Sequence, residues 1–346
     1  MPRKQIRATT SIPTMHDVAR RAGVSQSTVS RVLNQTATSV PISDETRQKI
    51  LDAVRELGYQ PNMIARSLRT QRTQMIAVMI GDISNAFYHP IVRAVQDVAR
   101  NYYYDVLISN SDHIYDNEVG FLEAVMRRPV DGIIMAPHRL TLEDIDKFIQ
   151  RSEIPVVSLG AQVHHPQVDV VGGTSEPATH EAITWLIQQR GHKRIGFIGT
   201  LDEMPPGPAR LRGYRRAMEE AGLPVESGFV QKADFTVDGG HHGMQAFLKQ
   251  RHPPTAIFAA NSLMAIGAMM AAQAAGRDVP GEISVMGFDD IPEARLIRPQ
   301  LTTVTRDLPK IGQQVADILF ERISGRETGP GRFFQSEWKL TIRESA

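Results

Sequence analysis

Short apolar runs alternate with amphipathic stretches through most of this chain, and this alternation is the feature that most limits its fold. The runs have the length and composition of buried strands, and the stretches between them have the spacing of helices. Strands that alternate with helices form parallel sheets with both faces covered. The pattern therefore predicts an α/β fold for the chain after residue 72.

The apolar runs predict strands at residues 76–80, 106–109, 132–135, 156–159, 168–171, 195–198, 256–259 and 283–288. Helices are expected between them, for example over residues 90–103, 178–189, 210–221 and 238–250. The units form two successive sets of four or five, which predicts two lobes. A ligand is then expected outside the carboxyl ends of the strands, in the cleft between the lobes.

Composition excludes several classes of site. The 346 residues include no cysteine, which removes disulfides, thiolate nucleophiles, cysteine-based zinc sites and iron–sulfur clusters. The pairs 164–165 and 241–242 are adjacent histidines, which we interpret as loop or surface residues, so no metal site is expected. No nucleotide-binding, phosphate-loop, nucleophile-elbow or zinc-protease motif is found, which predicts neither a cofactor nor enzymatic activity. The basic N-terminus lacks an apolar signal segment, so a cytoplasmic protein is expected.

The charge of the chain is strongly divided. Residues 1–72 hold twelve Lys or Arg and five Asp or Glu, whereas the whole chain holds 39 and 38. The N-terminal segment therefore carries a net charge of +7 and the remainder −6. A small basic module attached to a larger acidic one is typical of a protein that binds a polyanion, although a basic face can also be merely solvated.

The basic segment contains residues typical of the starts and ends of three short helices. Thr14 and Asp17 form a capping pattern before the first helix, which Gly23 ends. Ser25 precedes a second helix that runs to about Leu33, and a third helix runs from Ser43 to Gly58. Two short helices joined by one tight turn predict a helix-turn-helix, whose second helix enters the major groove of DNA.

The sequence DVARRAGVSQSTVSRVLN at residues 17–34, followed by LGYQPN and ARSL, closely resembles the DNA-binding head of the Lac repressor family. Further segments, including RGHKRIGFIG at 190–199 and VPGEISVMGFDD at 279–290, resemble the effector-binding core of that family. The resemblance implies a helix-turn-helix head over residues 1–60, a hinge helix and linker over 61–72, and a two-lobed, periplasmic-binding-protein-like body of parallel sheets over 73–346.

The resemblance also places the DNA contacts. The base-reading positions fall on Gln26, Ser27 and Arg31. This agrees with chemistry, because Arg bonds guanine and Gln bonds adenine in bidentate fashion. Groups that position the DNA backbone would be Thr14, Ser25, Thr28, Ser30 and Asn34. The hinge positions are Asn62 and Leu68, where Leu68 would wedge into the minor groove. Thr14 and Ser25 also suit simple helix caps, and Leu68 also suits ordinary packing.

In the body, the positions that match the effector pocket of the family are Phe87, Arg210, Phe235, Asn261 and Asp289. Arg, Asp and Asn suit the adjacent hydroxyls of a polyol, and an aromatic ring gives an apolar wall for its C–H groups. Structural roles are also open: Asp289 suits a turn cap, Arg210 suits an ion pair, and both phenylalanines suit an ordinary hydrophobic core. Carboxylates common in the family are replaced by Ser262 and by the stretch 173–176, which favours a sugar acid or a differently placed loop.

These observations predict a homodimeric, ligand-controlled transcription regulator, most simply a repressor. It would bind an inverted-repeat operator in double-stranded DNA and a sugar or sugar-acid effector between its lobes. Two alternatives belong to other classes. A free sugar-binding receptor would have no use for the basic head, and a sugar-modifying enzyme with a DNA-binding head would need catalytic groups that the motifs do not provide.

Overall fold

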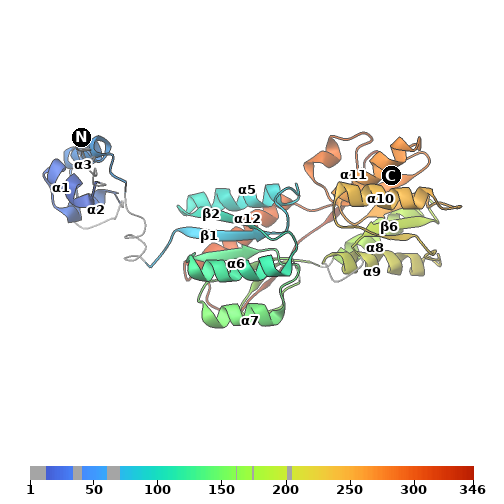
Figure 1. Ribbon diagram of the computed structural model, residues 1–346, viewed down its shortest axis with the longest axis horizontal. Helices are drawn as coiled ribbons and strands as arrows, with labels where there is room; N and C mark the ends of the chain where they lie inside the picture. The colour runs from blue at the N-terminus through green and yellow to red at the C-terminus, as the bar shows by residue number, and fades with distance from the viewer. Residues whose placement is uncertain (1–12, 34–40, 61–70, 161, 174, 201–204) are drawn as a thin grey trace, which may run out of the picture. The chain divides into compact units, whose positions relative to one another are not determined.

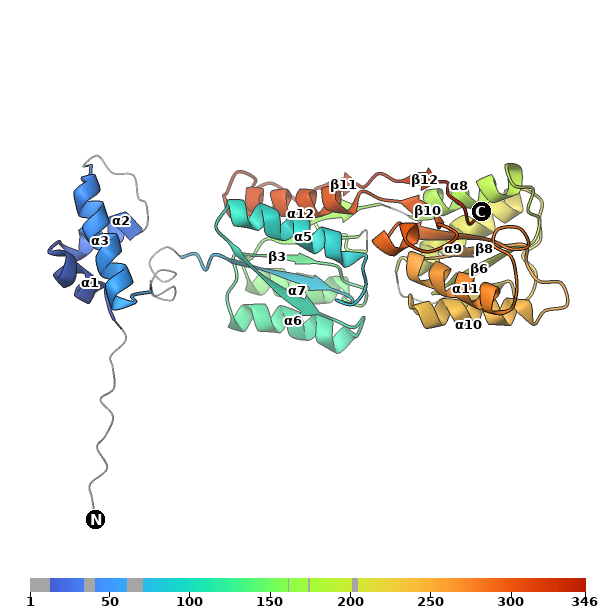
Figure 2. The same ribbon diagram turned by 90° about the horizontal axis from the view of Figure 1, so that it is seen from above.

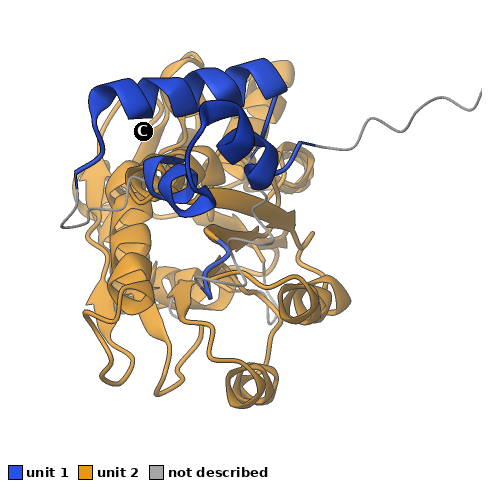
Figure 3. Cartoon of the chain, turned by 90° about the vertical axis from the view of Figure 1, so that its left-hand side faces the viewer, with its two compact units in different colours: residues 1–73 blue, residues 74–346 orange. Residues whose placement is uncertain are grey.

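The computed structural model describes residues 13–33, 41–60, 71–160, 162–173, 175–200 and 205–346. The chain divides into two compact units, residues 1–73 and 74–346, which are coloured separately in Figure 3. The division falls one residue after the linker expected from the sequence. Within the described residues, no helix is long and apolar enough to cross a membrane.

Three helices form the first unit: α1 (Met15–Ala22), α2 (Gln26–Leu33) and α3 (Asp44–Leu57). Gly23 and Gly58 end α1 and α3 in the left-handed conformation, with φ of 68° and 62°. Val18, Val29 and Ile50, one from each helix, have fully buried side chains and form the centre of a small core. The helix-turn-helix prediction is confirmed, because each helix contributes an apolar face to one shared core.

A six-stranded sheet forms the first lobe of the second unit (Figure 1). Its strand order is β11-β5-β4-β3-β1-β2, and every pair in it is parallel. The strands are β1 (Met75–Ile80), β2 (Asp105–Asn110), β3 (Gly132–Met135), β4 (Val156–Leu159), β5 (Asp169–Gly172) and β11 (Phe333–Gln335). Helices α5 (Tyr88–Asn101) and α12 (Leu308–Ile323) pack on one face, and α6 (Tyr115–Arg127) and α7 (Leu142–Arg151) pack on the other.

Strand β1 shows why its apolar run is continuous. Ile76 and Val78 point to the side of α5 and α12, whereas Ala77 and Met79 point to the side of α6 and α7. Since successive side chains of a strand face opposite ways, a strand covered on both faces is apolar at every position.

The second lobe repeats this architecture. Its sheet has the order β12-β10-β9-β8-β6-β7, in which only the β10–β12 pair is antiparallel. The strands are β6 (Ile195–Gly199), β7 (Val230–Lys232), β8 (Ala256–Ala259), β9 (Ser284–Asp289), β10 (Thr302–Thr305) and β12 (Lys339–Thr341). Figure 1 shows α10 (Val237–Leu248) and α11 (Ser262–Ala274) on one side of this sheet, and α8 (Ser175–Gln188) and α9 (Gly207–Glu220) on the other.

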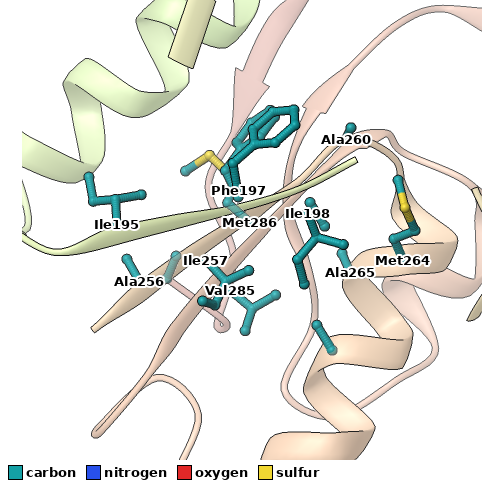
Figure 4. Close-up of a cluster of buried hydrophobic side chains, with 14 of the residues drawn as sticks. Ile195, Phe197, Ile198, Ala256, Ile257, Ala260, Met264, Ala265, Val285 and Met286 are labelled. Carbon is teal, nitrogen blue, oxygen red and sulfur yellow. The ribbon is translucent and has the colours of Figure 1, made fainter. Parts of the chain in front are cut away.

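The core of the second lobe is built on its central strands. Phe197 from β6, Ile257 from β8 and Val285 from β9 are fully buried and lie together in Figure 4. Helices α10 and α11 pack backbone against backbone beside them. A Cβ atom at Gly267 would collide with the carbonyl of Val237, and one at Gly240 with that of Met264, so this close packing requires glycine at both positions.

The two lobes are confirmed, but their division into two successive sets of units is wrong. The chain passes between the lobes three times, after β5, after β10 and after β11. Helix α12 and strand β11 therefore return to the first lobe before β12 completes the second (Figure 2). The amphipathic pattern of α12 indicates a helix but carries no signal for the lobe that it covers.

All eight predicted strands are present within one or two residues of their expected bounds. Four strands were not predicted: β7, β10, β11 and β12. They are three or four residues long and contain threonine, lysine or glutamine, so they lack the apolar signal of the central strands.

Candidate functional site

The first candidate site is the exposed surface around α2. Gln26 and Ser27 occupy the first turn of this helix and are exposed, while Arg31 lies one turn later and is partly buried. Val29 and Val32 face the core on the opposite side. The structure therefore brings the three expected base-reading residues to one short helix, with its apolar stripe turned away from them.

The hydroxyls expected to position DNA lie at the start of helices. Ser25 precedes α2, and its Oγ accepts a hydrogen bond from the backbone N–H of Thr28 at 3.2 Å. Thr14 caps α1 in a reciprocal capping box with Asp17. Thr28 and Ser30 are partly buried on α2. Both caps are thus structural, and their exposed position beside helix N-termini also suits contact with phosphate. Asn34, Asn62 and Leu68 lie outside the described residues.

The second candidate site is a pocket in the second unit, lined by residues of both lobes. All five effector positions expected from the sequence line it: Phe87, Arg210, Phe235, Asn261 and Asp289. They come from segments at the carboxyl ends of β1, β6, β7, β8 and β9. Since parallel strands bring their carboxyl ends to one edge of a sheet, residues far apart in sequence meet here.

Arg210 and Asp289 form a buried ion pair in this pocket. The Arg210 Nη2 atom donates to Asp289 Oδ1 at 3.2 Å, and the two side chains are 3% and 10% exposed. A second guanidinium nitrogen of Arg210 donates to the carbonyl of Ala260. The guanidinium also lies 3.7 Å from the centre of the Phe288 ring. Burial lowers the pKa of Arg210 to about 10, against the opposing effect of Asp289. Arg210 thus stays charged near neutral pH and is held in one place.

The backbone at Asp289 is strained. Asp289 has a φ of +87° and Asp290 a φ of +56°, in a region that side chains other than glycine rarely adopt. The carboxylate of Asp290 binds Arg343 at 2.7 Å and Arg295 at 3.0 Å, which ties this turn to the C-terminal segment. Such strain persists only where the surroundings enforce it, and it is most common at binding sites.

Asn261 and Phe235 support one another. Asn261 Oδ1 accepts from the backbone N–H of Met264 and caps α11, while its Nδ2 donates to the carbonyl of Phe235 at 2.9 Å. Phe235 has a φ of +65° and is nearly buried. The amide of Asn261 therefore holds the segment that carries the Phe235 ring. On the other lobe, Phe87 packs edge-on against Tyr88, with ring centres 5.0 Å apart.

Three further residues that line the pocket were not identified from the sequence: His113, His138 and Arg306. The two histidine rings meet edge to face, 4.3 Å between centres. Burial lowers the pKa of both and brings that of His138 to about 3, with the neighbouring His113 adding to the effect on His138. Both imidazoles are therefore neutral at pH 7. Each of the three residues follows the carboxyl end of a strand, and this position is the sequence feature that could have identified it as a pocket residue.

The loop that carries His138 is fixed by a buried carboxylate. Glu118 accepts hydrogen bonds from the backbone N–H groups of His138, Arg139 and Leu140 at 2.8–2.9 Å. Its side chain is fully buried, and these three donors compensate for its lost hydration. Across the described ranges, no group of His, Cys, Asp or Glu is arranged to hold a metal ion.

Known proteins share both units. Residues 14–62 match the model of the lacI family of bacterial regulatory proteins, and residues 186–346 match the periplasmic binding protein-like domain. Catabolite control protein A of Priestia megaterium is 36% identical, over 96% of this chain and 98% of that protein. The transcriptional repressor CytR of Escherichia coli K12 is 33% identical, over 96% of both chains.

Comparison with solved structures indicates the same family as these relatives do. The Lac repressor dimer bound to operator and the anti-inducer ONPF superimposes with a TM-score of 0.83 at 26% identity, covering 96% of this chain and 98% of that one. A complex of the transcriptional regulator CelR with cellobiose gives a TM-score of 0.71 at 30% identity, over 96% and 100% of the two chains. With its helix-turn-helix unit, its two-lobed unit and full-length relatives above 30% identity, the chain belongs to the lacI family of bacterial regulatory proteins.

Proposed function

We propose that this member of the family is a homodimeric repressor in the cytoplasm, without enzymatic activity, and that a sugar or sugar acid in the pocket controls its binding to an inverted-repeat operator. The observation that carries the proposal is the combination of an exposed α2 on a basic unit with a pocket built around Arg210 and Asp289. The first binds DNA, and the second binds a small polar molecule.

The pocket chemistry supports a polyol. Arg210 and Asp289 offer charged groups that hydrogen-bond adjacent hydroxyls, and Phe87 and Phe235 offer flat apolar surfaces. The similar regulator CelR is solved as a cellobiose complex, which agrees with this chemistry. The mechanism is a population shift: a ligand that prefers one arrangement of the two lobes favours the state of the protein that has this arrangement. The ligand therefore changes DNA binding when the state that it favours has a different affinity for the operator from the state that it disfavours.

The operator is expected to be an inverted repeat, because a two-fold dimer presents the same α2 helix twice. In vitro selection of random DNA with the full chain tests this. Recovery of two half-sites in opposite orientation agrees with the proposal, whereas a single asymmetric site would contradict the dimeric arrangement.

Arg31→Ala is expected to lose about 1–3 kcal/mol of discrimination between the selected operator and a scrambled duplex, because Arg31 would no longer bond a guanine edge. Salt-dependent binding to the scrambled duplex should remain. Arg20→Ala serves as the control, since Arg20 is an exposed arginine of α1 outside the expected base-reading set. Fluorescence anisotropy at two salt concentrations measures both quantities. If Arg31→Ala and Arg20→Ala behave alike, the assignment of Arg31 is wrong.

A further inference from the structure

The pocket holds more positive than negative charge. Three charged side chains line it, namely Arg210, Arg306 and Asp289. His113 and His138 are neutral there because burial lowers their pKa. Among the described lining residues there are thus two cations and one anion, and Asp289 is already paired with Arg210.

Arg306 is the cation without a carboxylate of its own. Its Nη2 donates to the hydroxyl of Ser175 at 3.3 Å, and its guanidinium lies 5.5 Å from the centre of the Phe288 ring. Its Nε is fully buried and has no hydrogen-bond partner within the described residues, where Arg306 also forms no ion pair. Burial lowers the pKa of Arg306 and Asp289 partly opposes this, but an arginine stays protonated in a protein. The side chain as a whole is partly buried, and a partly buried cation with so few partners is costly unless an anion joins it.

Arg210 shares this environment. Its Nε is also buried without a partner among the described residues, and its guanidinium contacts the same Phe288 ring as Arg306. The charge of Arg306 contributes to the lowered pKa of Arg210, so the two guanidinium groups are near enough to repel. A single negative group beside them would relieve that repulsion and supply acceptors for the free N–H donors.

The opposite wall offers a different kind of contact. The Nδ1 atoms of His113 and His138 are fully buried, and neither has a hydrogen-bond partner among the described residues. A neutral imidazole nitrogen bonds a hydroxyl group well and gives no compensation to a second charge. The pocket therefore has a cationic wall on the second lobe and a neutral polar wall on the first.

We infer that the ligand is an acidic polyol, carrying one carboxylate or phosphate that binds Arg306 and hydroxyls that face the histidine wall. This inference rests on the proposed function and narrows its ligand from a sugar or sugar acid to the charged class. Carboxylate and phosphate share the chemistry that a guanidinium recognises, so the test separates them.

The test is thermal unfolding of the full chain at constant ionic strength with matched probes: glucose, glucuronate and glucose 6-phosphate, then galactose, galacturonate and galactose 6-phosphate. Acetate and inorganic phosphate report anion binding without a sugar. The proteins are the parent chain, Arg306→Gln, Arg306→Lys and the control Arg216→Gln. Arg216 is an exposed arginine of the same lobe that pairs with Glu220 at 2.8 Å.

An acidic sugar is expected to raise the melting temperature of the parent and of Arg216→Gln more than its neutral counterpart does. Arg306→Gln should bind that acid at least tenfold more weakly, and Arg306→Lys should keep a preference for acid over neutral sugar. Without ligand, Arg306→Gln should melt no lower than the parent, because it removes a partly buried cation without breaking an ion pair. The response to uronate or to sugar phosphate identifies the negative group.

Any of the following results would overturn the inference: a neutral sugar that stabilises the parent as well as its acid does, an acidic sugar that still raises the melting temperature of Arg306→Gln as much as that of the parent, or stabilisation by acetate and phosphate but by no acidic sugar. The last would mean adventitious anion binding only. No shift with any anion would also overturn it. Operator binding measured with the same probes separates this failure from failure of the proposed function. If a neutral sugar changes operator affinity, the proposed function as a ligand-controlled regulator is supported, and only the inference that the ligand is acidic is wrong.

Discussion

Replacing Asp169 with Asn is expected to lower the free energy of unfolding by about 3–5 kcal/mol. The Asp169 side chain is fully buried on β5 and binds Arg322 of α12 at 2.7 and 3.0 Å. It also accepts from the backbone and side-chain N–H groups of Arg332 at 2.8 and 3.1 Å. Removal of this charge takes away the fully buried partner of the two arginines and leaves them with Glu321 and Glu327, which are more exposed. It also loosens the contact between β5, α12 and the segment before β11.

Urea unfolding of the full chain, followed by far-ultraviolet circular dichroism, measures this loss. Asp97→Asn is the matched control, because Asp97 binds Arg93 at 2.9 Å on the exposed surface of α5 and its loss should leave the midpoint nearly unchanged. If Asp169→Asn is as stable as the control, the network does not hold the first lobe together.

Acid should weaken the same contact. Burial by itself raises the pKa of Asp169, but hydrogen bonds from Arg322 and Arg332 outweigh burial and leave the pKa below its ordinary value. A carboxyl group whose pKa is lower when folded stabilises the protein fully above its unfolded pKa of about 3.9 and loses that contribution as the pH falls. The stability difference between parent and Asp169→Asn should therefore be constant above about pH 5 and shrink below about pH 4. A constant difference down to pH 2 would exclude this cause.

Asp289→Asn and Arg210→Gln are expected to weaken effector binding at least tenfold while operator binding survives, since each charge-assisted hydrogen bond contributes about 1.5–3 kcal/mol. The protein should then stay in its ligand-free response, which for an induced repressor means permanent repression. Calorimetry with the most stabilising probe sugar, together with operator binding, measures both properties.

The buried pair requires a further control. Either single change also breaks an ion pair whose members are 3% and 10% exposed, so lost stability could imitate lost binding. The double variant Arg210→Met with Asp289→Asn removes both charges, so neither is left buried without its partner. Asparagine, like aspartate, tolerates the positive φ of +87° at this position. It should fold and bind operator without responding to effector. Unchanged effector affinity in the two single variants would place the ligand elsewhere.

The predicted parts of the fold are those whose signal is local. The central strands, such as β3 and β8, are apolar at every position because helices cover both faces. Strand β10 contains three threonines in four residues, and its assignment as a strand depends on pairing with β9 and β12. Such pairing is a tertiary property, so no window of the sequence indicates it.

The site divides in the same way. Arg210 and Asp289 were identified from motif resemblance, and the structure adds the fact that they bind each other. Arg306 follows a strand that was not predicted, and the charge of His113 and His138 depends on burial. The charge balance of the pocket is therefore a property of the folded chain, and composition alone could not predict it.

The three passages of the chain between the lobes limit how this regulator can be recombined with its relatives. Helix α12 and strand β11 belong to the first lobe, although they follow almost all of the second in sequence. A gene fusion with a single junction inside residues 74–346 would therefore build one lobe from segments of two different proteins. A chimera that exchanges a complete lobe needs a junction at each of the three passages, near residues 173, 306 and 337. By contrast, one junction near residue 73 exchanges the whole DNA-binding unit, so operator specificity can be transferred far more simply than half of an effector pocket.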